Sequence, residues 1–142
     1  MQTWAYPARI EDQGVDGFLV TFPDVPEALT GADTLAGARS NAADALEEAI
    51  LAYMAMGRAI PEPREPQDHE ELVVLDPVTA ARAILAQAMR ADRVSNVTLA
   101  KRLGKSEGAV RRLTDGATGV KIDTVLEALD AVGRRTVLSL MV

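Results

Sequence analysis

Apolar and polar positions alternate at the start of the chain, which is the pattern of β-strands. Between Trp4 and Glu11 every second residue is apolar or aromatic, so one face of this strand should point toward a core. Phe18–Phe22 is a second run of aromatic and β-branched residues, and two glycines between the runs supply a turn. Residues 28–32 can form a third strand. The pattern predicts an antiparallel sheet.

A helical period follows the predicted strands. Thr34 can cap a helix, and Gly57 is a natural stop for it. Between them, apolar residues recur every three or four positions, as in a helix with one buried face. These positions are Leu35, Ala38, Ala42, Leu46, Ala49, Tyr53 and Met56. Glu47 and Glu48 are expected on the outer face of this helix.

The second half of the chain is expected to be helical. Asp76 as a cap and Pro77 at the first helical position predict a helix to about Arg90. Ile122–Leu129 has the period of another amphipathic helix. Residues 134–142 form an apolar tail that is expected to be strand-like.

Residues 95–116 have the spacing of a helix-turn-helix. A short helix containing the small residue Ala100 is followed by Gly104, which can adopt the positive φ of a tight turn. Ser106 can then cap a second helix. In such a motif the second helix enters the major groove, and basic residues around it contact phosphates. The residues predicted to bind DNA are Asn96, Thr98, Lys101, Lys105, Ser106, Glu107, Gly108, Arg111 and Arg112.

A proline-rich segment separates the two halves. Three prolines fall within six residues, and proline disfavours regular structure because it fixes φ and lacks an N–H donor. We therefore expect a first domain over residues 1–66, a linker over 67–77 and a second domain over 78–142. The run Leu72–Leu75 reads as a strand. The sequence leaves open whether it joins the first sheet or the second domain.

Charge is divided unevenly between these halves. The chain has 142 residues and a formal net charge of −6. Residues 1–70 contain thirteen Asp or Glu against four Arg, a net charge of −9. Residues 71–142 contain eleven Lys or Arg against eight acids, a net charge of +3. Such asymmetry suggests differently charged partners for the two halves, although acidic residues that only keep a small domain soluble explain the first half equally well.

Composition excludes several classes of protein. The chain has no Cys and one His, so disulfide frameworks, thiolate metal sites and cysteine nucleophiles are impossible. The lone His69 lies in the proline-rich segment without a nearby serine, which leaves a Ser-His-Asp triad without support. No basic leader or long apolar run is present in the sequence. We expect a cytoplasmic protein with no cofactor, no metal and no membrane contact.

Short motifs spread over nearly the whole sequence make the chain resemble the HicB antitoxins, in the branch with a C-terminal helix-turn-helix of the Xre or Cro type. The pattern F-P-D-x-P, followed by D-T and a long helix, is the more specific part of the resemblance. The motifs are Tyr6–Ala8, Gly17–Pro26, Thr30–Thr34, Asn41–Leu46, Ile60–Pro63 and Leu99–Gly104. The chain departs from the family pattern at Glu27-Ala28, where Gly-Cys is usual, and at Arg93, where Gly is frequent.

This resemblance implies an α+β fold: a partial RNase-H-like antiparallel sheet with a long helix, lacking a nuclease site, joined to an all-α helix-turn-helix domain. It implies a protein that neutralises a HicA-type, mRNA-cleaving ribonuclease toxin and represses its own operon. The acidic residues Asp24, Glu27 and Asp33 are expected to face the toxin. A repressor of this type is expected to be a homodimer at least, and the tail is a candidate contact, although it could equally cover its own domain.

Two other classes of function compete with the antitoxin. A nuclease of RNase-H-like fold would need clustered carboxylates that hold two metal ions, and Asp24, Glu27 and Asp33 are the candidates. However, no carboxylate interrupts Phe18–Phe22. A plain transcriptional repressor would use the first domain for ligand binding or oligomerisation. A small basic reading frame beside the gene would favour the antitoxin.

Overall fold

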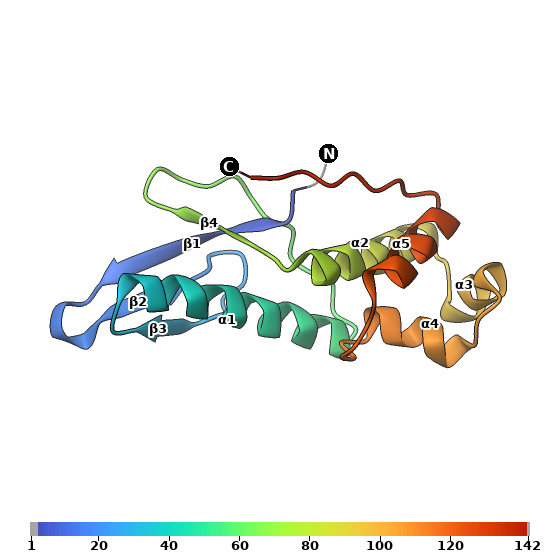
Figure 1. Cartoon of the computed structure of the whole chain (residues 1–142), viewed down its shortest axis with the longest axis horizontal. Helices are drawn as coiled ribbons and strands as arrows, with labels where there is room; N and C mark the ends of the chain where they lie inside the picture. Colours follow the sequence, from blue (N-terminus) through green and yellow to red (C-terminus); the bar gives the residue numbers. More distant parts are fainter. Residues whose placement is uncertain (1–2, 142) are drawn as a thin grey trace.

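The computed structural model describes residues 3–141, in which the first half of the chain forms a four-stranded antiparallel sheet (Figure 1). The order of the strands is β3-β2-β1-β4. Their bounds are β1 (Ala5–Asp12), β2 (Phe18–Thr21), β3 (Thr30–Ala32) and β4 (Glu71–Val74), with a 3-10 helix over Gly14–Asp16 in the first hairpin. The strands expected near residues 4–11, 18–22 and 28–32 are therefore present.

The central strand β1 pairs with a different neighbour along each half. Its second half pairs with β2, with Ile10 opposite Val20. Its first half pairs with β4, with Tyr6 opposite Val73. The run Leu72–Leu75, which the sequence left unassigned, thus belongs to the sheet, and the segment expected as a linker over 67–77 contains an edge strand.

The long helix α1 (Leu35–Ala55) covers one face of the sheet. Its start is fixed by Thr34, whose hydroxyl oxygen accepts a hydrogen bond from the Gly37 amide at 3.0 Å. Most of the predicted stripe is buried: Ala38, Ala42, Leu46, Ala49 and Tyr53 lie in the core, together with Ile50 and Met54. Leu35 and Met56, which the pattern placed on the same stripe, are exposed because they lie at the two ends of the helix, beyond the core. Burial of apolar side chains between this helix and the sheet supplies most of the stability of this part.

Helices make up the second half, at one end of the molecule in Figure 1. They are α2 (Pro77–Asp92), α3 (Asn96–Leu103), α4 (Glu107–Thr114) and α5 (Ile122–Ala131). Asp76 caps α2 as predicted, by accepting hydrogen bonds from the Val78 and Thr79 amides. The α+β fold predicted from the sequence is confirmed.

Helix α2 belongs to two cores at once. Ala83 packs in the core that lies between the sheet and α1. Leu85 packs in a second core with residues of α3, α4 and α5. Glu47 of α1, expected on the outer face, instead accepts a hydrogen bond from the Thr79 hydroxyl of α2. That expectation was wrong because α1 is covered by α2 as well as by the sheet.

The C-terminal tail is not a strand. Residues 134–141 have no regular secondary structure. In Figure 1 they run from α5 back toward the end of the molecule that holds the sheet. Leu138 and Leu140 are 80% and 83% exposed. A strand requires hydrogen-bond partners along its length, and the tail pairs with no strand among the described residues. None of the helices in the described range could span a membrane.

Candidate functional site

Helices α3 and α4 are joined by the tight turn that the sequence predicted. Gly104 ends α3 with φ of 65°. The hydroxyl oxygen of Ser106 caps α4 by accepting a hydrogen bond from the Ala109 amide at 3.1 Å. Leu99 and Val110 are fully buried between the two helices and the rest of the second core. The apolar contacts therefore hold one side of the helix pair and leave its other side exposed.

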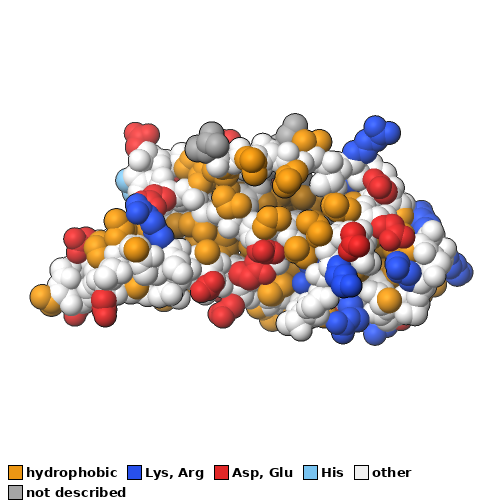
Figure 2. All heavy atoms as spheres, in the orientation of Figure 1, with side chains coloured by type: hydrophobic (Ala, Val, Ile, Leu, Met, Phe, Trp, Pro, Cys, Tyr) orange, Lys and Arg blue, Asp and Glu red, His pale blue; other side chains and the backbone are white. Residues whose placement is uncertain are grey.

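Basic residues gather on that exposed side. Figure 2 shows most of the blue side chains at the end of the molecule formed by α3 and α4. The exposed cations of the pair are Lys101, Arg102, Lys105, Arg111 and Arg112. Thr98 and Gly108 are exposed as well, whereas Asn96 and Glu107 are half-buried. The residues predicted to bind DNA thus lie together on this helix pair and its turn.

Several of these side chains already have partners within the chain. Glu107 and Arg111 form an ion pair across one turn of α4, which raises the pKa of Arg111. Arg112 donates a hydrogen bond to the Thr118 carbonyl at 3.1 Å. Lys101 and Lys105 have no such partner within residues 3–141. These two lysines can reach a phosphate without breaking an existing contact.

The acidic residues expected to face a toxin have different surroundings. Asp33 is exposed. Glu27 is exposed too, but it accepts a hydrogen bond from the Tyr53 hydroxyl at 2.8 Å, which lowers the pKa of Glu27. Asp24 is half-buried and accepts a hydrogen bond from the Arg64 amide at 3.2 Å. Of the three carboxylates, Asp24 is therefore the one that is partly covered by its neighbours.

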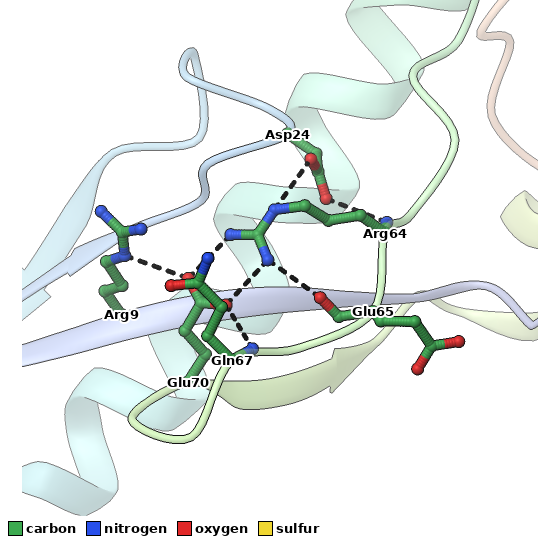
Figure 3. A network of polar contacts seen from close by, with 6 residues as sticks. All are labelled: Arg9, Asp24, Arg64, Glu65, Gln67 and Glu70. Atoms are coloured by element: carbon green, nitrogen blue, oxygen red, sulfur yellow. Dashed lines mark hydrogen bonds and ion pairs between the residues drawn. The ribbon is translucent and has the colours of Figure 1, made fainter.

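A polar network surrounds Arg64 in the proline-rich segment (Figure 3). Its guanidinium lies 3.5 Å from Asp24 and donates to both carboxylate oxygens of Glu70, at 2.9 and 2.8 Å. Arg9 of β1 donates to the same carboxylate at 3.0 Å, and the backbone amide of Gln67 donates to it at 2.8 Å. These donors lower the pKa of Glu70 to about 2. Through Glu70, the proline-rich segment is therefore fastened to β1 of the sheet.

Residues 5–84 match the family described as "HicB_like antitoxin of bacterial toxin-antitoxin system". The chain belongs to the HicB-like antitoxins. It is similar to Antitoxin HicB 2 of Photorhabdus laumondii, with 38% identity over 129 residues that cover 91% of each protein. It is 32% identical to Antitoxin HicB of Escherichia coli (strain K12) over 91% of this chain and 94% of that protein. Antitoxin HicB of Pseudomonas fluorescens is 36% identical over 82% of this chain and 80% of that protein.

Membership of this family confirms the resemblance to the HicB antitoxins, and a HicB-like antitoxin is a regulatory protein, not an enzyme. The C-terminal helix-turn-helix of the Xre or Cro type stays a prediction. Two of the three carboxylates considered as nuclease ligands have partners within the chain. Asp24 is occupied by Arg64 and Glu27 by Tyr53. No group of three or more His, Asp or Glu side chains in the described part of the chain could hold a metal ion.

Sequence reasoning missed the residues that fasten the parts of this HicB-like antitoxin together. Arg64 and Glu70 lie among prolines, where no periodicity marks a buried pair. Arg82 is 4% exposed on α2. A signal for its burial existed, because Arg82 stands three residues before Leu85 and seven before Met89 on the apolar stripe of a helix.

Proposed function

We propose that this HicB-like antitoxin neutralises a HicA-type, mRNA-cleaving ribonuclease through its first half and represses its own operon through α3 and α4. The observation that carries the proposal is that the division of charge along the sequence nearly coincides with a structural division between the sheet with α1 and the helix pair α3–α4. Residues 1–70, with a net charge of −9, supply α1 and three of the four strands of the sheet. Residues 71–142, with a net charge of +3, supply the edge strand β4 and the exposed helix pair.

Electrostatics supports the toxin as partner of the first half. A ribonuclease needs a cationic surface for RNA, and an acidic protein is attracted to that surface and competes with RNA for it. Asp33 and Glu27 are exposed and carry this role in the proposal. Asp24 supports it indirectly, since its contact with Arg64 holds the proline-rich segment against the sheet.

Helix α4 is the element proposed to enter the major groove of operator DNA. It is one of two short helices joined by a tight turn, and it exposes Gly108, Arg111 and Arg112. Arginine side chains recognise guanine edges and phosphates. Lys105 belongs to the same proposed recognition surface, and Lys101 is proposed to contact the DNA backbone. Asn96, Thr98, Ser106 and Glu107 complete the proposed surface.

The apolar C-terminal tail is proposed to contact a second copy of the chain. Val137, Leu138, Leu140 and Met141 are all exposed by more than half. A contiguous exposed apolar segment marks an interaction site more often than isolated apolar residues do. Repressors with two half-sites bind as symmetric dimers, so we propose that the tails contribute to a homodimer interface.

Co-expression with the neighbouring gene tests the proposal. We expect a small basic protein encoded beside this chain to co-purify with it, and the complex or the free chain to retain a duplex taken from upstream of its own coding sequence. A plain repressor would retain the duplex without co-purifying any product of the neighbouring gene. Failure to retain either partner at modest ionic strength would refute both functions.

A further inference from the structure

Arg82 is a buried cation on α2 that contacts the end of α4. Its side chain is among the few polar groups in the cores of the described chain, with 4% of the residue exposed. The Nε atom donates a hydrogen bond to the Leu113 carbonyl at 2.9 Å, and Nη2 donates to the Arg112 carbonyl at 3.2 Å. Both carbonyls belong to the last turn of α4.

These contacts fit the chemistry of a helix C-terminus. The last four carbonyls of a helix have no partner within it, and the helix dipole makes that end negative. A guanidinium supplies several donors in a fixed plane, so it can bond two carbonyls at once and fix their orientation. A buried cation is costly unless it is paired in this way. Arg82 therefore has a directional role that a packed apolar residue at this position would not perform.

A second contact holds the residues just after α4 against α1. Gly116 has φ of +84°, and a Cβ atom added there would lie 2.9 Å from the Leu51 carbonyl oxygen and 3.3 Å from the Ala55 Cβ atom. The backbone of residue 116 therefore packs directly on the last turns of α1. Helices α1 and α2 are themselves joined by the hydrogen bond from Thr79 to Glu47.

We propose that Arg82 is the positioning residue of α4: by bonding its last carbonyls, it fixes the angle at which α4 is presented to DNA and ties that helix to the α1–α2 body. This inference rests on the proposed DNA-binding function. Arg82 itself is buried, so it lies outside the surface proposed to contact DNA. Because Arg82 ties α4 to the α1–α2 body, the acidic half and the basic helix pair move as one body rather than as two domains on a flexible linker.

The role predicts a particular defect when Arg82 is changed. Contacts to base edges depend on the orientation of α4, whereas attraction to phosphates depends mainly on charge. Arg82→Met should keep the helix pair basic while allowing α4 to tilt. Sequence-specific binding should then fall more than non-specific binding.

The first test compares affinities of the full chain for two duplexes: the DNA directly upstream of its coding sequence, and a scrambled duplex of equal composition. We expect Arg82→Met to lower the ratio of the two affinities at least about tenfold, which corresponds to roughly the loss of one good base contact. Arg82→Lys, which keeps the charge and one donor, should restore part of the ratio. Arg90→Met is the matched control, because Arg90 lies on the same helix with an exposed side chain that bonds the Gly57 carbonyl, and it should leave the ratio unchanged.

A variant that merely unfolds would lose both affinities in proportion and leave the ratio of the two unchanged. Retention of the full ratio by a folded Arg82→Met protein, judged by circular dichroism, would overturn the proposal. If the wild-type chain does not discriminate between the two duplexes, the proposed DNA-binding function fails, and the position of α4 is then decided by a measurement that needs no DNA.

That second measurement uses the absence of cysteine in the chain. Spin labels at Glu48→Cys on α1 and Ala109→Cys on α4 occupy exposed positions in each helix. Pulsed electron paramagnetic resonance measures the distribution of distances between the two labels. This distribution should be narrow with Arg82 present and broader with Arg82→Met, with Arg82→Lys between them. Equal widths for all three proteins would contradict a positioning role for Arg82, whatever the result with DNA.

Discussion

Glu70 is a carboxylate whose side chain is fully covered by protein, yet two arginines and a backbone amide donate hydrogen bonds to it. These donors stabilise the charged form, and they outweigh the burial that favours the neutral form. The result is a pKa lowered from 4.5 to about 2. Because Glu70 directly precedes β4, its charge state affects how firmly the edge strand and the proline-rich segment stay on the sheet.

The lowered pKa of Glu70 predicts a loss of stability in acid. A group with a lower pKa in the folded state stabilises the fold above its unfolded pKa, and the contribution disappears as pH falls toward the folded pKa. The free energy of unfolding should therefore decrease between pH 4.5 and about 2. The free energy of unfolding of Glu70→Gln, measured by urea titration, should decrease less over this interval, because the glutamine side chain has no proton to gain.

Glu65→Gln is the control for that experiment, since the Glu65 side chain is exposed and contributes only its backbone carbonyl to the Arg64 contacts. It should follow the wild-type profile. Parallel profiles for wild type and Glu70→Gln would show that the network around Arg64 does not stabilise the folded protein.

Arg93 gives a second prediction for a single residue. It has φ of 54° at the end of α2, the only positive φ of a non-glycine residue in the described part of the chain. The left-handed conformation costs an L-residue roughly 1–2 kcal/mol, part of which glycine recovers despite its larger unfolded-state entropy. Arg93→Gly should therefore raise the free energy of unfolding by up to about 1 kcal/mol in thermal or urea unfolding.

Arg93→Ala separates backbone strain from loss of the arginine side chain. Alanine keeps the strain, so this variant should be no more stable than the wild type. A gain in stability with alanine equal to the gain with glycine would assign the effect to the side chain and contradict the strain argument.

Most elements of secondary structure could be predicted from the periodicity of the sequence. The buried stripe of α1, the cap at Thr34 and the turn between α3 and α4 all follow from local rules for helices and their ends. The tail was predicted wrongly, because β-propensity describes residues that suit a strand and says nothing about whether a neighbouring strand is available. Assignment of β4 to the sheet also depended on a partner distant in sequence.

At the scale of the helix pair, α4 should determine DNA affinity. Replacing Arg111 and Arg112 together with Ala is expected to weaken binding to the upstream duplex by about 1–3 kcal/mol per lost base contact and to reduce the salt dependence of binding. Neutralisation of the toxin should be unchanged, because neither arginine lies on the sheet or α1. Fluorescence anisotropy at several salt concentrations measures the first effect.

A double variant with the same change in charge, Arg39→Ala with Arg58→Ala, is the control for binding to DNA, because both arginines lie in the first half of the chain. It should bind the upstream duplex as the wild type does. Equal loss of affinity in the two double variants would mean that total charge, and not α4, governs binding.

At the scale of the whole molecule, the tail is predicted to hold a dimer. Leu138→Asp with Leu140→Asp should shift the chain toward monomer in sedimentation experiments, because burial of each leucine contributes roughly 1.5–3 kcal/mol. Val15→Asp, at a fully exposed valine in the first hairpin, is the control. A wild-type chain that sediments as a monomer, or a dimer that survives both tail changes, would rule out this interface.

The relation between the two halves was the part that the sequence predicted least well. Charge divides the chain near residue 70, and the sequence analysis placed the end of the first domain at residue 66. A fragment ending at residue 66 lacks both β4 and Glu70, which complete the sheet and the network around Arg64. The contacts of α2 with both cores depend on tertiary packing that no local pattern encodes.

The central claim is that toxin neutralisation and DNA binding belong to different surfaces of one chain. Its most direct test is the rate of RNA cleavage by the product of the neighbouring gene, titrated with the wild-type chain and with the Arg111→Ala, Arg112→Ala double variant. We predict that both proteins stop cleavage at the same molar ratio. Cleavage that continues in a molar excess of the folded wild-type chain, or suppression that is lost in the double variant, would contradict the account.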